Sequence, residues 1–133
     1  MNYLLDANTF IEAKNRYYQP AFCPAYWDWL LQAHAGGQLA SIDNVGDELR
    51  RGNDELAIWA RSHADFFLGI SDEATQAAFA EVADHVARSE SEMRSGALAE
   101  FLGGADPWLI AKARCLGATI VTHERSDAFN RPI

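Results

Sequence analysis

The 133-residue sequence predicts an α/β fold: a three-layer α/β/α sandwich around a central, mainly parallel sheet. Two observations indicate this class. Short apolar runs alternate along the chain with longer segments whose apolar residues recur at helical spacing. Glycine and proline mark many of the boundaries between these segments. No internal repeat or interdomain linker interrupts the pattern, so residues 1–133 are expected to form a single domain.

The first unit of this pattern is a buried strand at residues 2–5, followed at once by a helix at about 6–16. The strand ends at Asp6, and either Asp6 or Asn8 is expected to cap the helix. This unit therefore delivers one carboxylate to a strand-to-helix turn.

A second helix is expected at about 25–35, because Pro24 suits the first turn of a helix and a glycine pair follows its end. It carries Tyr26, Trp27 and Trp29. These aromatic side chains fit two interpretations, a platform for stacking nucleobases or ordinary core packing. Core packing is the favoured interpretation.

A second strand at residues 39–42 leads into a helix that Asp43 or Asn44 is expected to cap. This helix carries the adjacent acids Asp47 and Glu48. Most such pairs on a helix are simply solvated surface, so a functional role for Glu48 depends on where the fold places it.

The next three segments are a helix at about 54–64, an apolar run at 66–70 and a helix at about 72–88. The apolar run fits either a small strand or a packed linker. Ser71 is expected to open the helix at 72–88 through an incomplete capping box.

The last helix has a strong start signal, with Asp106 expected as its N-cap and Pro107 at its first position. A helical turn at about 97–102 is expected before it. The helix continues over 108–116 and is followed by a strand at 118–121. This strand completes the predicted sheet.

Composition restricts the functional classes. The net charge of −8 counts against a generic nucleic-acid binder, but less against a nuclease whose bound metal meets the phosphate. Cys23 and Cys115 form no CxxC pair, which favours a reducing compartment and a cytoplasmic location. No signal peptide or membrane span is expected. GxSxG, P-loop, GxGxxG and HExxH motifs are absent from the sequence.

Four acids lie where a parallel sheet would gather them. Asp6 and Glu124 directly follow predicted strands, and Glu48 lies one helical turn after another strand. Asp106 begins the helix that leads into the last strand. Because ligands bind at the carboxyl ends of parallel strands, we expect these acids to meet around Mg²⁺ or Mn²⁺, which prefer oxygen ligands.

Asp6 and Asp106 are the expected direct ligands, with Glu48 and Glu124 acting on a second ion or through water. Helix capping alone is the alternative explanation for Asp6 and for Asp106.

Two polar neighbours, Asn8 and Thr122, can orient a ligand, a water or a phosphate. Asn8 can equally be a helix cap, and Thr122 a β-branched strand end. His123 is read as exposed or substrate-facing, because a metal-activated water does not require it as a general base.

Four segments resemble the PIN-domain family of metal-dependent ribonucleases, which includes the VapC toxins, and in particular an uncharacterised bacterial and archaeal branch of it. The segments are LLDAN at 4–8, DELRRG at 47–52, ADPWLIAKA at 105–113 and TIVTHE at 119–124. The resemblance implies an endoribonuclease that uses Mg²⁺ or Mn²⁺ and is the toxin of a toxin–antitoxin pair. The implied catalytic and metal-binding acids are Asp6, Glu48, Asp106 and Glu124.

The sequence departs from the PIN pattern at its C-terminal end. Glu124 stands where many members have Asp, and Asp127 is close enough to compete for the same role. PIN domains usually continue with a further strand, whereas this sequence stops nine residues after Glu124. The natural C-terminal strand is therefore expected to be missing, or the domain to close differently.

Several basic residues are candidates for contacts with RNA phosphates: Lys14, Arg16, Arg51, Lys112 and Arg125. For each of them taken singly, ordinary surface charge is the stronger interpretation. Arg51 can instead pair with an acid of its own helix turn.

Two further functions remain open. The fold can serve as a catalytically inactive PIN-like binding module, or as a nuclease directed at DNA. An RNA substrate and an antitoxin protein are the expected partners. PIN toxins are commonly dimers, and the apolar helices at 25–35 and 54–64 can supply either a dimer interface or the core.

Overall fold

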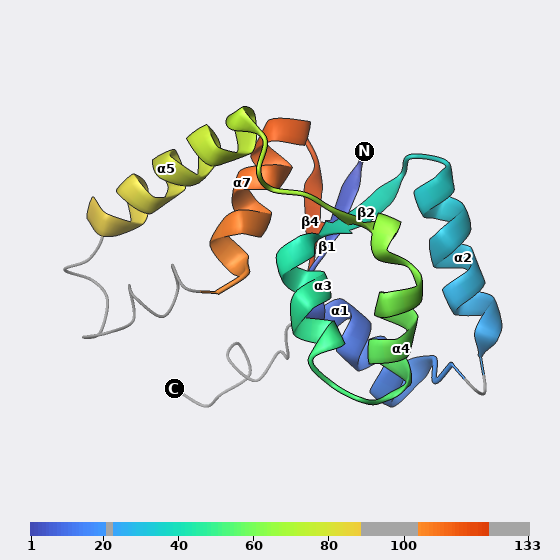
Figure 1. The fold of residues 1–133 in the computed structure, drawn as a ribbon. Coiled ribbons are helices and arrows are strands. Elements are labelled where there is room, and N and C mark those ends of the chain that lie inside the picture. The colour runs from blue at the N-terminus through green and yellow to red at the C-terminus, as the bar shows by residue number, and fades with distance from the viewer. Residues whose placement is uncertain (21–22, 89–103, 123–133) are drawn as a thin grey trace, which may run out of the picture.

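The computed structural model describes residues 1–20, 23–88 and 104–122, and within them it confirms the predicted α/β/α class. One parallel sheet runs through the molecule in the strand order β3-β2-β1-β4, and Figure 1 labels β2, β1 and β4 of it. Its strands are β1 (Tyr3–Leu5), β2 (Leu39–Ile42), β3 (Phe67–Leu68) and β4 (Thr119–Val121). Sequence alone left residues 66–70 as strand or linker, and the structure places the two-residue edge strand β3 there.

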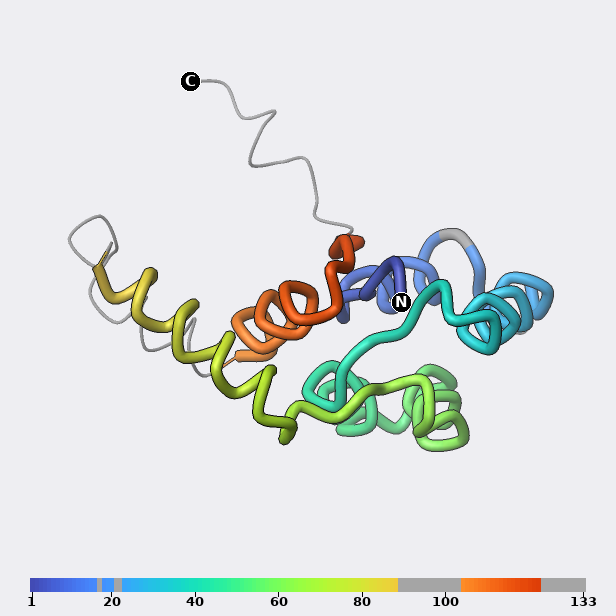
Figure 2. The backbone as a smooth tube through the Cα atoms, turned by 90° about the horizontal axis from the view of Figure 1, so that it is seen from above, coloured from blue at the N-terminus to red at the C-terminus, as the bar shows by residue number. Residues whose placement is uncertain are grey.

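Helices cover both faces of the sheet. The α-helices are α1 (Ala7–Glu12), α2 (Pro24–Ala35), α3 (Asp43–Arg50), α4 (Glu55–Ser62), α5 (Glu73–Arg88) and α7 (Asp106–Leu116). A π-helical turn, η1 (Ala13–Tyr17), continues α1, and a 3₁₀ turn, η2 (Ala64–Phe66), precedes β3. Figure 2 shows α5 and α7 on one side of the sheet and α2 and α4 on the other. None of the helices in the described ranges is long and apolar enough to cross a membrane.

The core is built on the strands and on a cluster of aromatic rings. All four residues of β2 are buried, as expected for a central strand of a parallel sheet. Phe10 of α1 contacts the rings of Trp59 and Phe66 at centroid distances of 5.8 Å each. Trp27 is buried against Trp59, which confirms core packing for that residue, whereas Trp29 is 53% exposed.

Local capping decides where the helices begin, and it differs from the sequence prediction at α3, at α5 and, beside the candidate site, at α7. Asp72, rather than Ser71, accepts a hydrogen bond from the Thr75 amide at the start of α5. Asp43 is already helical, and the N-cap position of α3 belongs to Ile42, whose backbone is extended. A side chain caps a helix from an extended backbone conformation, so Asp43 cannot do it. The expected helical turn at 97–102 lies outside the described residues.

Candidate metal centre

The carboxyl ends of β1 and β4 form the place where a site is expected in this topology. The two strands are parallel neighbours, with Leu5 opposite Val121. The chain leaves β1 toward β2 on one side of the sheet, and β4 is added on the other side. Such a reversal of strand order opens a crevice at the strand ends, where ligands of α/β proteins bind.

Asp6 is fixed firmly at this position. It follows β1, and its extended backbone lets the side chain cap α1, with Oδ1 2.9 Å from the Thr9 amide nitrogen. The Thr9 hydroxyl lies 2.9 Å from the same oxygen and 3.0 Å from the Val121 carbonyl. Oδ2 accepts a hydrogen bond of 2.5 Å from the Thr122 hydroxyl. Asp6 therefore ties the end of β1 to the end of β4, and its Oδ2, which accepts a single hydrogen bond, keeps acceptor capacity for a ligand.

Asp106, unlike Asp6, does not cap a helix, so the prediction that it caps α7 is wrong. The N-cap position belongs to Ala105, which is itself in the helical conformation (φ −77°, ψ −26°), and Asp106 is the first helical residue. Its side chain is exposed and makes no hydrogen bond to any residue of the described ranges. Capping therefore does not explain this carboxylate.

Asp6 and Asp106 face one pocket of about 300 Å³, although a hundred residues separate them in the sequence. The pocket is lined by Asp6, Asn8, Asp106, Leu109, Ile110, Ile120 and Thr122. The polar neighbours predicted from the sequence, Asn8 and Thr122, are thus at the same site as the two acids. We refer to this as the Asp6–Asp106 pocket.

Glu48 does not line the Asp6–Asp106 pocket. It lines a second pocket of about 200 Å³, which we call the Glu48 pocket, formed by Asn44, Asp47, Glu48, Arg51, Gly104, Ala105 and Trp108. The two pockets lie on either side of the start of α7, because Ala105 lines one and Asp106 the other. The remaining predicted residues, His123, Glu124, Arg125 and Asp127, lie outside the described part of the chain.

Three of the candidate RNA-binding cations make ion pairs within the fold. Lys14 contacts Asp54 and Lys112 contacts Asp72, each at 2.9 Å, and Arg16 pairs with Glu12 of its own helix. The hydrogen bond from Lys14 is the main cause that lowers the pKa of Asp54.

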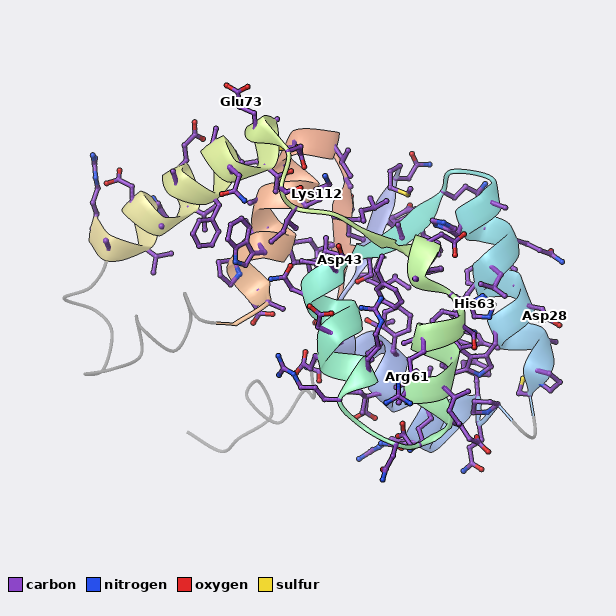
Figure 3. The ribbon with its side chains drawn as sticks, viewed as in Figure 1. Asp28, Asp43, Arg61, His63, Glu73 and Lys112 are labelled. Carbon is purple, nitrogen blue, oxygen red and sulfur yellow. The ribbon has the colours of Figure 1, made fainter. Side chains whose placement is uncertain are left out.

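Lys112, which Figure 3 labels on α7, likewise holds the pKa of Asp72 well below its usual range. Arg51 lines the Glu48 pocket instead.

Sequence patterns did not indicate a role for two further residues: Thr9, which contacts Asp6 but lines neither pocket, and Trp108. Thr9 donates two hydrogen bonds to Asp6. The sequence feature that could have indicated this is its position three residues after the N-cap, where a backbone amide and a hydroxyl can both reach the carboxylate. Trp108 lines the Glu48 pocket, but an apolar residue in the first turn of a helix is normally read as core.

The donors of the Asp6–Asp106 pocket suit a hard divalent cation. Two carboxylates, an amide and a hydroxyl supply oxygen ligands, and Mg²⁺ usually needs only one or two carboxylates because it keeps several waters. In the described ranges, no three His, Cys, Asp or Glu side chains come close enough together to hold a metal ion. The donor type therefore fits Mg²⁺ or Mn²⁺. Of the four expected acids, Asp6 and Asp106 line this pocket, Glu48 lines the other, and Glu124 lies outside the described residues.

Fold and site together define an α/β/α protein with paired acids at the carboxyl edge of a parallel sheet. Residues 3–132 match the model of the family described as "Domain of unknown function (DUF4411)", and the chain belongs to that family. Comparison with curated proteins gave no match, and comparison with solved structures gave none either.

Proposed function

We propose that this protein is a metal-dependent endoribonuclease of the PIN type that cleaves RNA phosphodiester bonds at the Asp6–Asp106 pocket. One observation carries the proposal. Two carboxylates that are distant in sequence line one pocket at the switch point of the sheet. One of them is held by three protein donors, and the other has no partner among the described residues.

The residues of the pocket would divide the work. Asp6 and Asp106 would hold Mg²⁺ or Mn²⁺, which when bound supplies positive charge at the phosphate and an activated water. Thr9 and Thr122 keep the Asp6 carboxylate oriented, as outer partners of metal ligands do. The Asn8 amide, at the rim of the same pocket, can orient a water or a phosphate oxygen.

An inactive PIN-like binding module is the second candidate function. It is favoured by the fact that only two acids among the described residues line the pocket, together with the net charge of −8. The two candidates differ in metal binding. Calorimetry that detects no binding of Mn²⁺ at millimolar concentration would favour the inactive module.

A role as the toxin of a toxin–antitoxin pair is a further part of the proposal. It is supported by the resemblance to the VapC toxins, and it implies cytoplasmic action and an antitoxin partner. Expression of the wild type is expected to arrest growth, and Asp6→Asn is expected to relieve that arrest. Arrest by both proteins alike would contradict the toxin role of this site.

RNA cleavage in the presence of Mn²⁺ tests the enzymatic proposal. Wild type is compared with Asp6→Asn and Asp106→Asn, with Asp28→Asn as the matched control. Asp28 is an exposed acid on α2 and does not line either pocket (Figure 3). We expect cleavage by wild type and the control but not by the other two variants. Equal cleavage by all four proteins would refute the assignment, and cleavage of single-stranded DNA in place of RNA would identify a DNA-directed nuclease.

A further inference from the structure

One cationic side chain that lines the Glu48 pocket, Arg51, has no partner among the described residues. Of the lysine and arginine side chains in the described ranges, all but Arg51 make an ion pair or a hydrogen bond within the protein. Arg51 is exposed at the end of α3 and lines the pocket. Its guanidinium is therefore available to a ligand in this pocket.

Charge in the pocket is partly compensated. Arg50 contacts the carboxylate of Asp47 at 2.9 Å and stays with its own helix. Glu48 has no ion pair or hydrogen bond with the described residues, so it and Arg51 are the two charges left open to a ligand. A guanidinium presents a planar set of donors that matches a phosphate.

Trp108 supplies an aromatic side chain to the lining of the same pocket. Trp108 stacks on Phe79 of α5, with ring centroids 3.7 Å apart and an interplanar angle of 12°. Phe79 covers one face of the indole, and the ring, which is also packed against the hydrophobic core, presents part of its remaining surface to the pocket. Nucleobases stack on such rings without strong sequence preference. The pocket volume, about 200 Å³, suits a single group rather than a drug-sized molecule.

We propose that the Glu48 pocket is a subsite for one nucleotide of single-stranded RNA, next to the nucleotide that is cleaved. Arg51 binds its phosphate and Trp108 stacks on its base. Asn44, which lines the same pocket, hydrogen-bonds an edge of the base. Ala105 and Asp106 are consecutive residues that line the two pockets, so one RNA strand can occupy both. The statement that this nucleotide lies next to the cleaved one rests on the proposed function, whereas the binding of RNA in the Glu48 pocket does not.

The test measures binding without cleavage. A fluorescein-labelled single-stranded hexaribonucleotide is titrated with the full chain in EDTA and low salt, and anisotropy gives Kd. Arg51→Gln removes the charge at an exposed position without a protein partner. Arg88→Gln is the matched control, because Arg88 is exposed on α5 and pairs only with Asp84 among the described residues. Trp108→Phe keeps a ring against Phe79 while reducing the stacking surface.

We expect Arg51→Gln to raise Kd about fivefold and to reduce the slope of log K against log salt by about 0.7, the value for one phosphate contact on a single strand. Trp108→Phe is expected to raise Kd about threefold, and Arg88→Gln to leave both quantities unchanged. Equal Kd and slope for Arg51→Gln and Arg88→Gln would overturn the subsite. Failure of the wild type to bind the RNA at low salt would overturn it as well.

A cleavage arm separates this inference from the enzymatic proposal. If wild type cleaves RNA, Arg51→Gln should raise KM with kcat unchanged, since it removes binding common to ground and transition states. Unchanged KM would refute the subsite and leave the nuclease proposal intact. If wild type cleaves nothing, the nuclease proposal fails, and the binding titration still decides whether the subsite exists.

Discussion

The two pockets beside α7 differ in how their acids are held. In the Asp6–Asp106 pocket, Asp6 is fixed by the Thr9 amide and by the hydroxyls of Thr9 and Thr122. In the Glu48 pocket, the open charges Glu48 and Arg51 have no partner in the described part of the chain. The first arrangement suits a ligand that needs fixed geometry, and the second leaves the Arg51 guanidinium open to a phosphate of a flexible polyanion.

The same contrast occurs inside the first pocket. Asp6 is part of the fold because it caps α1 and joins β1 to β4. Asp106 makes no such contact with the described residues, although it lines the same pocket. If both acids serve one reaction, their substitution should have similar effects on activity and different effects on stability.

The largest effect is expected for the two acids of the first pocket. Asp6→Asn keeps the capping oxygen and Asp106→Asn has no cap to lose, so both variants should fold like the wild type. Each is expected to lower the rate of Mn²⁺-dependent RNA cleavage by about 100-fold or more, because partners of metal ligands alone already cost 10- to 100-fold. Single-turnover cleavage measures this loss. Glu48→Gln should lower the cleavage rate less than Asp106→Asn does. A larger loss for Glu48→Gln would contradict the proposed division of roles between the two pockets.

The next largest effect concerns the groups that hold Asp6. Thr122→Val removes the hydroxyl that donates to Oδ2 and keeps the β-branched shape of the strand end. We expect about a tenfold loss of cleavage, partly recovered at higher Mn²⁺ concentration, because the carboxylate is less well oriented. A kcat profile against Mn²⁺ concentration measures both. Full activity at all Mn²⁺ concentrations would show that the orientation of Asp6 does not matter.

Asp6 and Asp106 should differ in their contribution to stability, although their substitution should lower activity to a similar extent. Asp6→Ala removes an N-cap and is expected to lower the free energy of unfolding by about 1 kcal/mol. Asp106→Ala should change it by less than about 0.5 kcal/mol, as for other surface positions without contacts. Urea denaturation gives both values. Equal destabilisation by the two substitutions would contradict the structural difference described above.

The smallest effect concerns the ion pair that joins α7 to the start of α5. Lys112 of α7 donates to Asp72 at the start of α5 and lowers the pKa of that carboxyl from its ordinary value of 3.8. A lowered pKa means that the stabilising contribution is present above about pH 4 and is lost as the pH falls below it. The difference in Tm between wild type and Asp72→Asn should therefore be constant near neutral pH and shrink below about pH 4. A difference that grows on acidification would contradict this assignment, and salt should weaken the exposed pair.

The sequence pattern predicted the sheet and most helix ends, because these depend on local rules. The strands predicted at 39–42 and 118–121 from short apolar runs correspond to β2 and β4, and α7 ends at Leu116, just before Gly117, whose φ of +65° favours glycine. The capping of α1 by Asp6, one of the two residues expected there, also followed from residue type.

The predictions that failed depended on backbone angles that residue type alone does not determine. Asp43 and Asp106 both precede or begin helices and looked like caps, but each lies one residue inside its helix. A shift of one residue changes an aspartate from a cap into a carboxylate directed elsewhere. For Asp106 this shift is what leaves the side chain open to a ligand.

Topology predicted the edge at which the acids meet, but not their division into two pockets. Strand order at the carboxyl edge brings Asp6, Glu48 and Asp106 to the same end of the sheet. The start of α7 then separates Glu48 from the other two, which depends on how that helix packs. Side-chain contacts such as that of Thr9 with Asp6, and the stacking of Trp108 on Phe79, likewise require the tertiary structure.

Titration calorimetry with Mn²⁺ tests the central claim that Asp6 and Asp106 hold one cation together. Wild type and the Asp28→Asn control should bind Mn²⁺ with the same affinity. Asp6→Asn and Asp106→Asn should each weaken binding at least about tenfold. Unchanged affinity in either of these two variants, or no binding by the wild type, would contradict the claim.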